Sequence, residues 1–298
     1  MKLSDVLLIS ICCIIWGANV PVTKWCIEFV PPVFLVLLRI GSVAVLLIPF
    51  LRPVPKQFWL VFLISNCVGG LNFVLLFLAL KYANASSVAI VGQIGLPIAT
   101  VLSVIFLKEQ VKWRRTMGIL MALFGVVIVI YKPNVATLEL GLFFAFGNAA
   151  AGAIGTILMK RLIPIGSLHL QAWTSLLSVI PLAIGTLFFE HNQLQGLVNG
   201  GPLLWVAIVF SVLAVSILGH TVYYSLVKKY DVTLVMPFTL MVPIWAVIAA
   251  VIFLNEQVTL QLVLGGLICL TGVGLIAIRQ NKSLGKQGLA ATRETLGL

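Results

Sequence analysis

The chain has 298 residues, of which 61% are hydrophobic and 9% are charged, and its formal net charge at pH 7 is +11. Soluble domains are about 45–50% apolar and about 25% charged, so this composition excludes a soluble enzyme and a disordered chain. The basic residues are spread between long apolar runs instead of forming one patch. This distribution excludes a nucleic-acid-binding domain and indicates a polytopic membrane protein.

Ten apolar runs are long enough to cross a bilayer, whose hydrocarbon core of about 30 Å needs about 20 residues of helix. Runs such as 206–218 do not alternate as the strands of a β-barrel would. We therefore predict an all-α polytopic membrane protein with ten transmembrane helices. In chain order the predicted spans are 4–24, 33–51, 58–80, 85–106, 114–131, 138–159, 168–189, 202–227, 232–254 and 260–279.

The distribution of lysine and arginine predicts the orientation of these spans. With a cytoplasmic N-terminus, fifteen of the 19 basic residues lie inside, three lie outside (Lys24, Lys81 and Lys132), and Arg39 lies within a span. Both termini are therefore predicted to be cytoplasmic. The first apolar run continues to Val22 without a cleavage-site pattern, which argues against a signal peptide. Residues 281–298 are predicted to form a flexible cytoplasmic tail.

The second half of the chain repeats the first. Residues 107–111 (LKEQV) match 254–258 (LNEQV) at an offset of 147, and Gly118 and Gly125 match Gly265 and Gly272 at the same offset. The predicted domains are two five-helix repeats, 1–133 and 134–280. Because five is odd, the halves cross the membrane in opposite directions, and the basic residues of 108–115 are absent from 255–262. Inverted repeats are typical of secondary transporters, with the site near the midplane between the halves.

Several motifs of this chain, in their order and spacing, match one family pattern. They are Trp16-Gly17-x-Asn19 with Lys24, Pro31-Pro32 followed by Leu38-Arg39, and two L-x-E-Q-V-x6-G-x6-G units. The chain resembles the drug/metabolite transporter superfamily, in particular its EamA-type exporters, over about residues 4–280. The resemblance implies ten helices around a central cavity lined mainly by spans 1, 3, 4, 6, 8 and 9. It also implies outward transport of amino acids or related metabolites across the bacterial inner membrane.

Polar side chains inside predicted spans are costly, and each one needs a partner or a ligand. The amides in spans 3, 4 and 6 can bind a zwitterion or a neighbouring helix. In span 8 a histidine shares a helix face with two tyrosines, where it can bind substrate, respond to pH or hydrogen-bond another helix. The predicted substrate-binding residues are Trp16, Asn72, Gln93, Asn148, His220, Tyr223 and Tyr224.

Two basic residues and three prolines have other predicted roles. Arg39 in span 2 is an anchor for a substrate carboxylate or, as the favoured interpretation, a structural partner of Glu28 or of a helix-end carbonyl. Lys24 is placed at the outer mouth. Pro21, Pro97 and Pro243 are predicted helix breaks or gating bends, and Pro97 and Pro243 occupy nearly corresponding places in the two halves.

The predicted function is therefore a secondary transporter that exports amino acids or related small polar metabolites by alternating access. A drug or nucleotide-sugar-like carrier of the same superfamily is an alternative, and an intramembrane enzyme acting on a lipid-linked substrate is an alternative of another class. The five cysteines show no C-x-x-C spacing and the sequence has no P-loop, so no metal or cofactor is predicted. The expected partners are a small molecule and membrane lipid, without nucleic acid, and the expected state is a monomer or homodimer.

Overall fold

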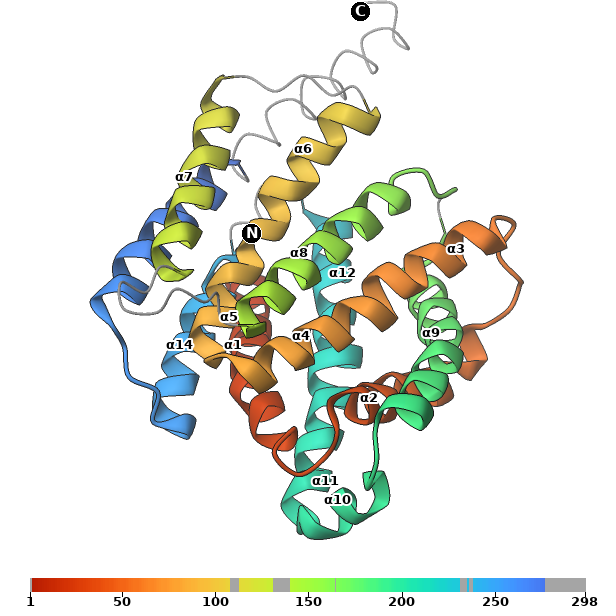
Figure 1. Ribbon diagram of the computed structural model, residues 1–298. Coiled ribbons are helices and arrows are strands. Elements are labelled where there is room, and N and C mark those ends of the chain that lie inside the picture. Colours follow the sequence, from red (N-terminus) through yellow and green to blue (C-terminus); the bar gives the residue numbers. More distant parts are fainter. Residues whose placement is uncertain are drawn as a thin grey trace, which may run out of the picture.

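The computed structural model describes residues 2–107, 113–130, 140–163, 165–230, 235 and 238–276, and these residues form helices without a strand (Figure 1). The predicted all-α fold is confirmed. Six helical runs have the length and composition to cross a membrane, and four shorter apolar helices fall on the remaining predicted spans. The chain is therefore a multi-pass membrane protein, as predicted.

In the first half, some spans are single helices and others are interrupted. Span 1 is α1 (Leu3–Cys26), and span 2 is α2 (Pro32–Leu46), followed by the short 3-10 helix η1 (Ile48–Phe50). Spans 3 to 5 consist of α3 (Phe58–Ile64), η2 (Ser65–Gly70), α4 (Leu71–Tyr82), α5 (Ala85–Val91), η3 (Gly92–Ile94), α6 (Gly95–Leu107) and α7 (Trp113–Ile130).

The second half repeats this arrangement and adds one short helix that was not predicted, α10 (Gln193–Asn199). Its spans consist of α8 (Leu140–Met159), α9 (Ser167–Phe189), α11 (Gly201–Phe210), η4 (Ser211–Gly219), α12 (His220–Lys229), α14 (Met241–Leu254) and the helix Leu260–Ile276. The predicted tail, 281–298, lies outside the described residues.

The third span of each half contains a π-helical turn, η2 in the first half and η4 in the second. Such wide turns often mark functional sites, because they displace backbone carbonyls from the regular helical ladder. The two turns therefore repeat a local irregularity of the backbone at corresponding places in the two halves.

Two of the three predicted proline breaks coincide with interruptions in the helix. Pro97 follows the 3-10 turn η3, and Pro243 follows a turn at Leu240. A proline lacks an N–H group and clashes with the carbonyl four residues before it, which accounts for both positions. Pro21 lies inside α1, which continues through it to Cys26 without a break.

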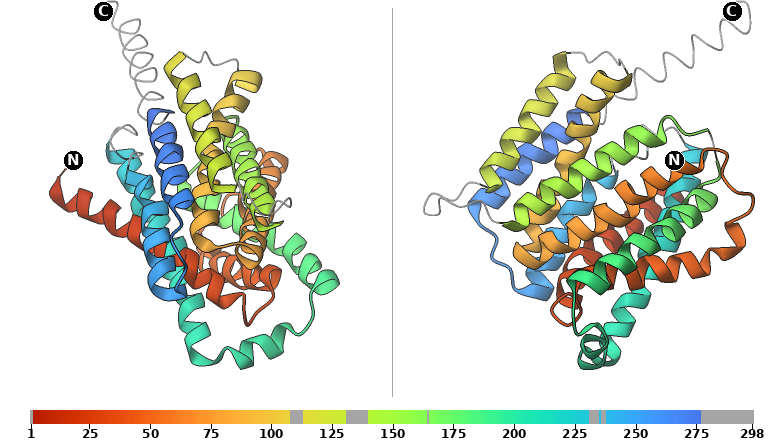
Figure 2. Two further views of the ribbon diagram at one scale, coloured as in Figure 1. Left: turned by 60° about the vertical axis from the view of Figure 1, so that its left-hand side comes forward. Right: turned by 45° about the vertical axis from the view of Figure 1, so that its right-hand side comes forward.

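The two halves pack against each other in a repeated pattern. The first helix of each half contacts the third and fourth spans of the other half, so that α1 packs on α14 and α12 while α8 packs on α6 and α4. Figures 1 and 2 show α4 and α8 side by side, and α2 also contacts α9. This exchange makes the interface between the halves the main packing surface of the molecule.

The glycines of the repeat motif form the contact between α7 and the helix Leu260–Ile276. A Cβ atom on Gly118 would lie 2.8 Å from the carbonyl oxygen of Gly272, and one on Gly125 would lie 2.6 Å from that of Gly265. The reverse distances, from Gly272 to Gly118 and from Gly265 to Gly125, are 2.6 and 2.7 Å. The two helix backbones therefore approach at two reciprocal points where only glycine fits.

Two glutamates of the second half bind the N-terminal ends of helices in the first half. Glu190, at the end of α9, accepts hydrogen bonds of 2.8 Å from the backbone N–H groups of Val33 and Phe34 in α2. Glu256 accepts from the N–H groups of Ala85 and Ser86 in α5 at 2.7 and 3.0 Å. A carboxylate is stabilised there because the first N–H groups of a helix have no partner in the helix itself.

Glu256 also joins α1 to this end of the bundle. Its carboxylate lies 3.1 Å from the ammonium group of Lys24, which also donates to the carbonyl of Ala83 at 2.8 Å. Burial alone would raise the pKa of Glu256, but hydrogen bonds from Ser86 and Ala85 and the charge of Lys24 outweigh burial and hold the pKa below its usual value. Lys24, predicted at the outer mouth, is thus part of a contact among three spans.

Replacing Gly125 by alanine is expected to destabilise the protein by about 1–3 kcal/mol, because the new Cβ would overlap backbone atoms. The melting temperature of the purified protein in detergent measures this. Gly41→Ala in α2 is the matched control, since its Cβ would meet nothing within 4 Å, and it should leave the melting temperature unchanged or slightly raised. Equal melting temperatures for Gly125→Ala and the wild type would contradict the close approach.

Glu256→Gln is expected to lower the melting temperature at pH 7 and to have a smaller effect at pH 4. Folding lowers the pKa of Glu256, so its carboxylate stabilises the protein above the unfolded-state value of about 4.3. This stabilisation is lost as pH falls through the folded-state pKa. Melting curves at both pH values measure the difference, with Glu28→Gln, at an exposed position, as control. If the melting temperatures of Glu256→Gln and the wild type differ more at pH 4 than at pH 7, folding does not lower the pKa of Glu256.

Candidate functional site

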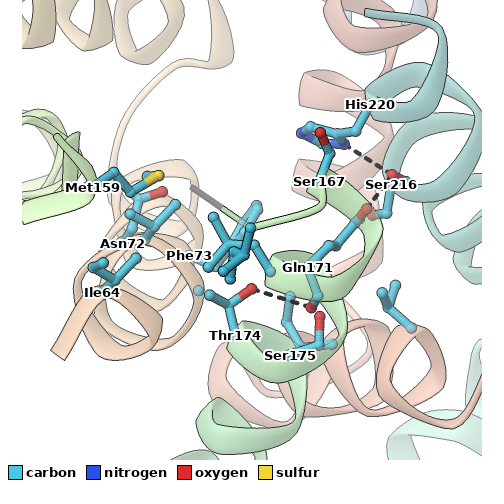
Figure 3. Close-up of a pocket in the computed structure, with 16 residues that line it drawn as sticks. Ile64, Asn72, Phe73, Met159, Ser167, Gln171, Thr174, Ser175, Ser216 and His220 are labelled. Carbon is cyan, nitrogen blue, oxygen red and sulfur yellow. Dashed lines mark hydrogen bonds between the residues drawn. The ribbon is translucent and has the colours of Figure 1, made fainter. Parts of the chain in front are cut away.

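A cavity of about 390 Å³ lies between the two halves of the chain. The first half contributes residues of α2, α3, η2 and α4, and the second contributes α9, η4, α12, the last residue of α8 and the loop that follows it. Figure 3 shows Ile64, Asn72 and Met159 on one side and Gln171, Ser216 and His220 on the other. Because both halves form its wall, relative movement of the halves would change its shape.

The described wall of the cavity carries neutral polar groups, one histidine and no carboxylate. Most of the polar groups belong to the second half, and the remaining wall is largely apolar. The polar lining residues are Asn72, Ser167, Gln171, Thr174, Ser175, Ser216 and His220.

Ser216, in the π-helical turn η4, is the centre of the polar wall. Its carbonyl oxygen accepts hydrogen bonds from Nδ1 of His220 at 2.9 Å and from Nε2 of Gln171 at 3.1 Å. Its hydroxyl accepts from Nε of Arg39 at 3.1 Å and donates to the carbonyl of Ser211 at 3.0 Å. One residue therefore links spans 2, 7 and 8 through charged and neutral side chains.

The His220 ring is held by a hydrogen bond through Nδ1 and by contact with the Trp16 ring. A carbonyl oxygen can only accept, so the bond to Ser216 places a hydrogen on Nδ1 of His220. The Trp16 ring lies 5.4 Å from the His220 ring and 5.7 Å from that of Tyr223, and its Nε1 donates to the carbonyl of Val215 at 3.2 Å. Gly219 leaves room for this indole, since a Cβ there would lie 2.5 Å from Nε1.

Arg39 is buried behind the cavity wall, with 4% of its surface exposed. Besides the bond to Ser216, its guanidinium carbon lies 5.0 Å from the centre of the Phe73 ring. Its partners are therefore a hydroxyl and an aromatic face, and neither Glu28 nor a helix-end carbonyl binds it among the described residues. Since Ser216 and Phe73 also line the cavity, Arg39 lies one side chain away from it.

Asn72 and Asn148 bind each other's backbone. The amide of Asn72 donates to the carbonyl of Asn148, and the amide of Asn148 donates to the carbonyl of Asn72, both at 2.8 Å. This reciprocal pair joins α4 to α8. Asn72 also lines the cavity, so it can serve both the helix contact and a ligand.

The predicted site residues are thus only partly brought together. Asn72 and His220 line the cavity. Trp16 packs against both His220 and Tyr223, and Gln93, in η3, is not among the lining residues. The side chain of Tyr224 lies outside the part that the structure describes.

The wall of the cavity also differs from the one that the family resemblance implied. Among the described residues, the wall includes residues of spans 2 and 7, none of spans 1, 4 and 9, and from span 6 only Met159. Span 7 takes part because Gln171, Thr174 and Ser175 of α9 face the cavity.

That stripe on α9 was not singled out in the sequence. Gln171, Thr174, Ser175 and Ser178 follow the i, i+3, i+4, i+7 spacing of one helix face. A polar stripe within an otherwise apolar span is a readable signal that the face meets protein or a cavity instead of lipid.

Comparisons with known proteins agree with this architecture. The EamA-like transporter family matches residues 3–131 and 139–278. A protein of Escherichia coli (strain K12) named "Probable amino-acid metabolite efflux pump" is 25% identical, over 95% of this chain and 99% of its own. "Uncharacterized transporter YvbV" of Bacillus subtilis (strain 168) is 25% identical over 92% of each chain. A protein crystal structure, 19% identical, has the same fold, with a TM-score of 0.63 over 95% of this chain and 99% of that one.

Asn148→Ala is expected to destabilise the protein by about 0.6–1.7 kcal/mol, the range of single hydrogen bonds between membrane helices. Melting temperature in detergent measures the effect. The matched control is Asn66→Ala, because the Asn66 amide donates to the carbonyl of Phe62 in its own span and joins no second helix. If both variants melt at the same temperature, the reciprocal pair does not stabilise the contact between α4 and α8.

Proposed function

Because the chain belongs to the EamA-like transporter family, we propose that it exports amino acids or related small polar metabolites by alternating access. The family and the named relatives are transporters, which points to a transport role and not to an enzymatic one. The observation that carries the finer proposal is the cavity between the halves, whose described wall combines hydrogen-bonding groups, most of them from the second half, with a larger apolar part. Such a wall suits a small polar ligand with an apolar part.

The position of the cavity supports alternating access. Its wall includes Met159 at the end of α8, Ile165 in the following loop and Ser167 at the start of α9. In the predicted orientation this loop is cytoplasmic, so a ligand would enter from the inside. At the opposite end, Lys24 and Glu256 tie α1 to two other spans. Export would then require that the contact between Lys24 and Glu256 opens while the two halves close at the cytoplasmic end, near the loop between α8 and α9.

The choice of amino-acid metabolites rests on the relatives. The protein of Escherichia coli carries that substrate class in its name, and so does one of Salmonella typhimurium, 25% identical over 92% of this chain. Purified protein in liposomes loaded with a panel of labelled amino acids tests the proposal directly, with and without a pH gradient. Efflux of nucleotide sugars or cationic drugs in place of amino acids would favour the alternative carriers of the superfamily.

Filling the cavity is expected to stop transport. Leu170 lines the cavity from α9, so Leu170→Trp should reduce efflux at least about tenfold while the protein remains folded. Leu187→Trp, on the same helix at a position 73% exposed, is the control and should retain wild-type efflux. Efflux rates in liposomes and melting temperatures of both variants provide the measurement. Unchanged efflux by Leu170→Trp would mean that the substrate does not pass through this cavity.

A further inference from the structure

We propose that Arg39 and Gln171, both bonded to Ser216, recognise the carboxylate and the ammonium group of an α-amino acid. This inference rests on the proposed function and narrows it, since it requires both charged groups on one ligand. It assigns a substrate-recognition role to span 2 and to a glutamine of span 7.

The first observation is the uncompensated charge of Arg39. The guanidinium is buried, and the ion pairs of the described residues, Lys24 with Glu256 and Lys229 with Asp5, do not include it. Nε is its one nitrogen with a hydrogen-bonded partner among these residues. A buried cation without a counter-charge is costly, and a ligand carboxylate would supply that charge and accept from the remaining N–H groups.

The second observation is that the cavity wall separates Arg39 from a ligand by very little. Phe73 lies over the guanidinium and Ser216 binds it, and both residues line the cavity. A ligand in the cavity would reach the guanidinium only if the Phe73 ring moved aside. The same ring would cover the charge when no ligand is bound.

The third observation is an acceptor without a partner. Gln171 lines the cavity, and its Nε2 must face the Ser216 carbonyl, because the opposite amide orientation would place two oxygens together. The Oε1 atom is then fixed in position, and it is buried without a hydrogen-bond partner in the described part of the chain. A buried acceptor of this kind is destabilising until a donor reaches it, and a ligand ammonium is such a donor.

These features together favour an amino acid over the other ligand classes. Arg39 and Gln171 both bond to Ser216, so their side chains lie near each other. The carboxylate and the ammonium group of an α-amino acid are likewise close together, because both are attached to one carbon. A cationic drug would find no carboxylate among the described lining residues. The apolar part of the wall, which includes Ile40, Val43 and Val68, suits an apolar side chain.

The test uses efflux of labelled leucine from liposomes that contain the full-length protein. Unlabelled leucine, leucinamide (without the carboxylate) and N-acetyl-leucine (without the ammonium) are the competitors. For the wild type, leucine should compete about 10- to 100-fold better than either analogue, the range expected for one charge-assisted hydrogen-bonded contact.

Two variants separate the two contacts. Arg39→Gln should abolish the discrimination against leucinamide and keep that against N-acetyl-leucine, and Gln171→Leu should do the reverse. Arg39→Lys retains the charge and should keep part of the preference for leucine over leucinamide. Arg52→Gln and Gln195→Leu make the same substitutions at exposed positions and should behave as the wild type.

Failure of this inference differs from failure of the proposed function. If leucinamide or N-acetyl-leucine competes with the wild type as well as leucine does, the inference is wrong although the protein exports amino acids. If the liposomes export another amino acid instead of leucine, the amide and N-acetyl forms of that amino acid are the competitors, and equal competition by either form overturns the inference. If no amino acid of the panel leaves the liposomes, the proposed function fails first. The wild-type competition can overturn the inference even where a variant does not fold.

Discussion

The arrangement of the polar groups depends on two consecutive backbone carbonyls of the π-helical turn η4. The Val215 carbonyl accepts from Trp16, and the Ser216 carbonyl accepts from Gln171 and His220. Trp16 lies in span 1 and Gln171 in span 7, so these two carbonyls connect η4 to two other spans. Since polar groups inside a membrane need partners, each bond also satisfies a polar side chain within the bundle.

The rest of the molecule holds this polar centre in place from both sides. On one side the Asn72–Asn148 pair fixes α4 to α8, and on the other Arg39 connects α2 to η4. At the far end Glu256 joins α1 to α5. These polar contacts each cross between the halves, whereas the apolar surfaces that face lipid provide no force that would orient one helix against another.

Much of the fold could be predicted from the sequence. The lengths of the apolar runs predict the membrane spans, and the repeat at an offset of 147 residues predicts two halves that cross the membrane in opposite directions. The π-helical turns could not, since 65–70 (SNCVGG) and 211–219 (SVLAVSILG) lie inside long apolar spans and contain no proline that would mark an irregular turn. Asn72, Asn148 and His220 could be recognised as buried polar groups, but the sequence does not show whether a buried amide binds a ligand or a neighbouring backbone. Arg39 was recognised as unusual, yet its partner Ser216 lies 177 residues away.

The reciprocal glycine contacts have a consequence for how such a molecule can arise. Gly118 meets Gly272, the copy of Gly125, and Gly125 meets Gly265, the copy of Gly118. Each glycine thus contacts the duplicate of the other one, as in a two-fold symmetric dimer. A single five-helix unit already contains both sides of this contact, so two separate units inserted in opposite directions could pair through it. Gene fusion would then have made permanent an association that the ancestral unit could form with itself.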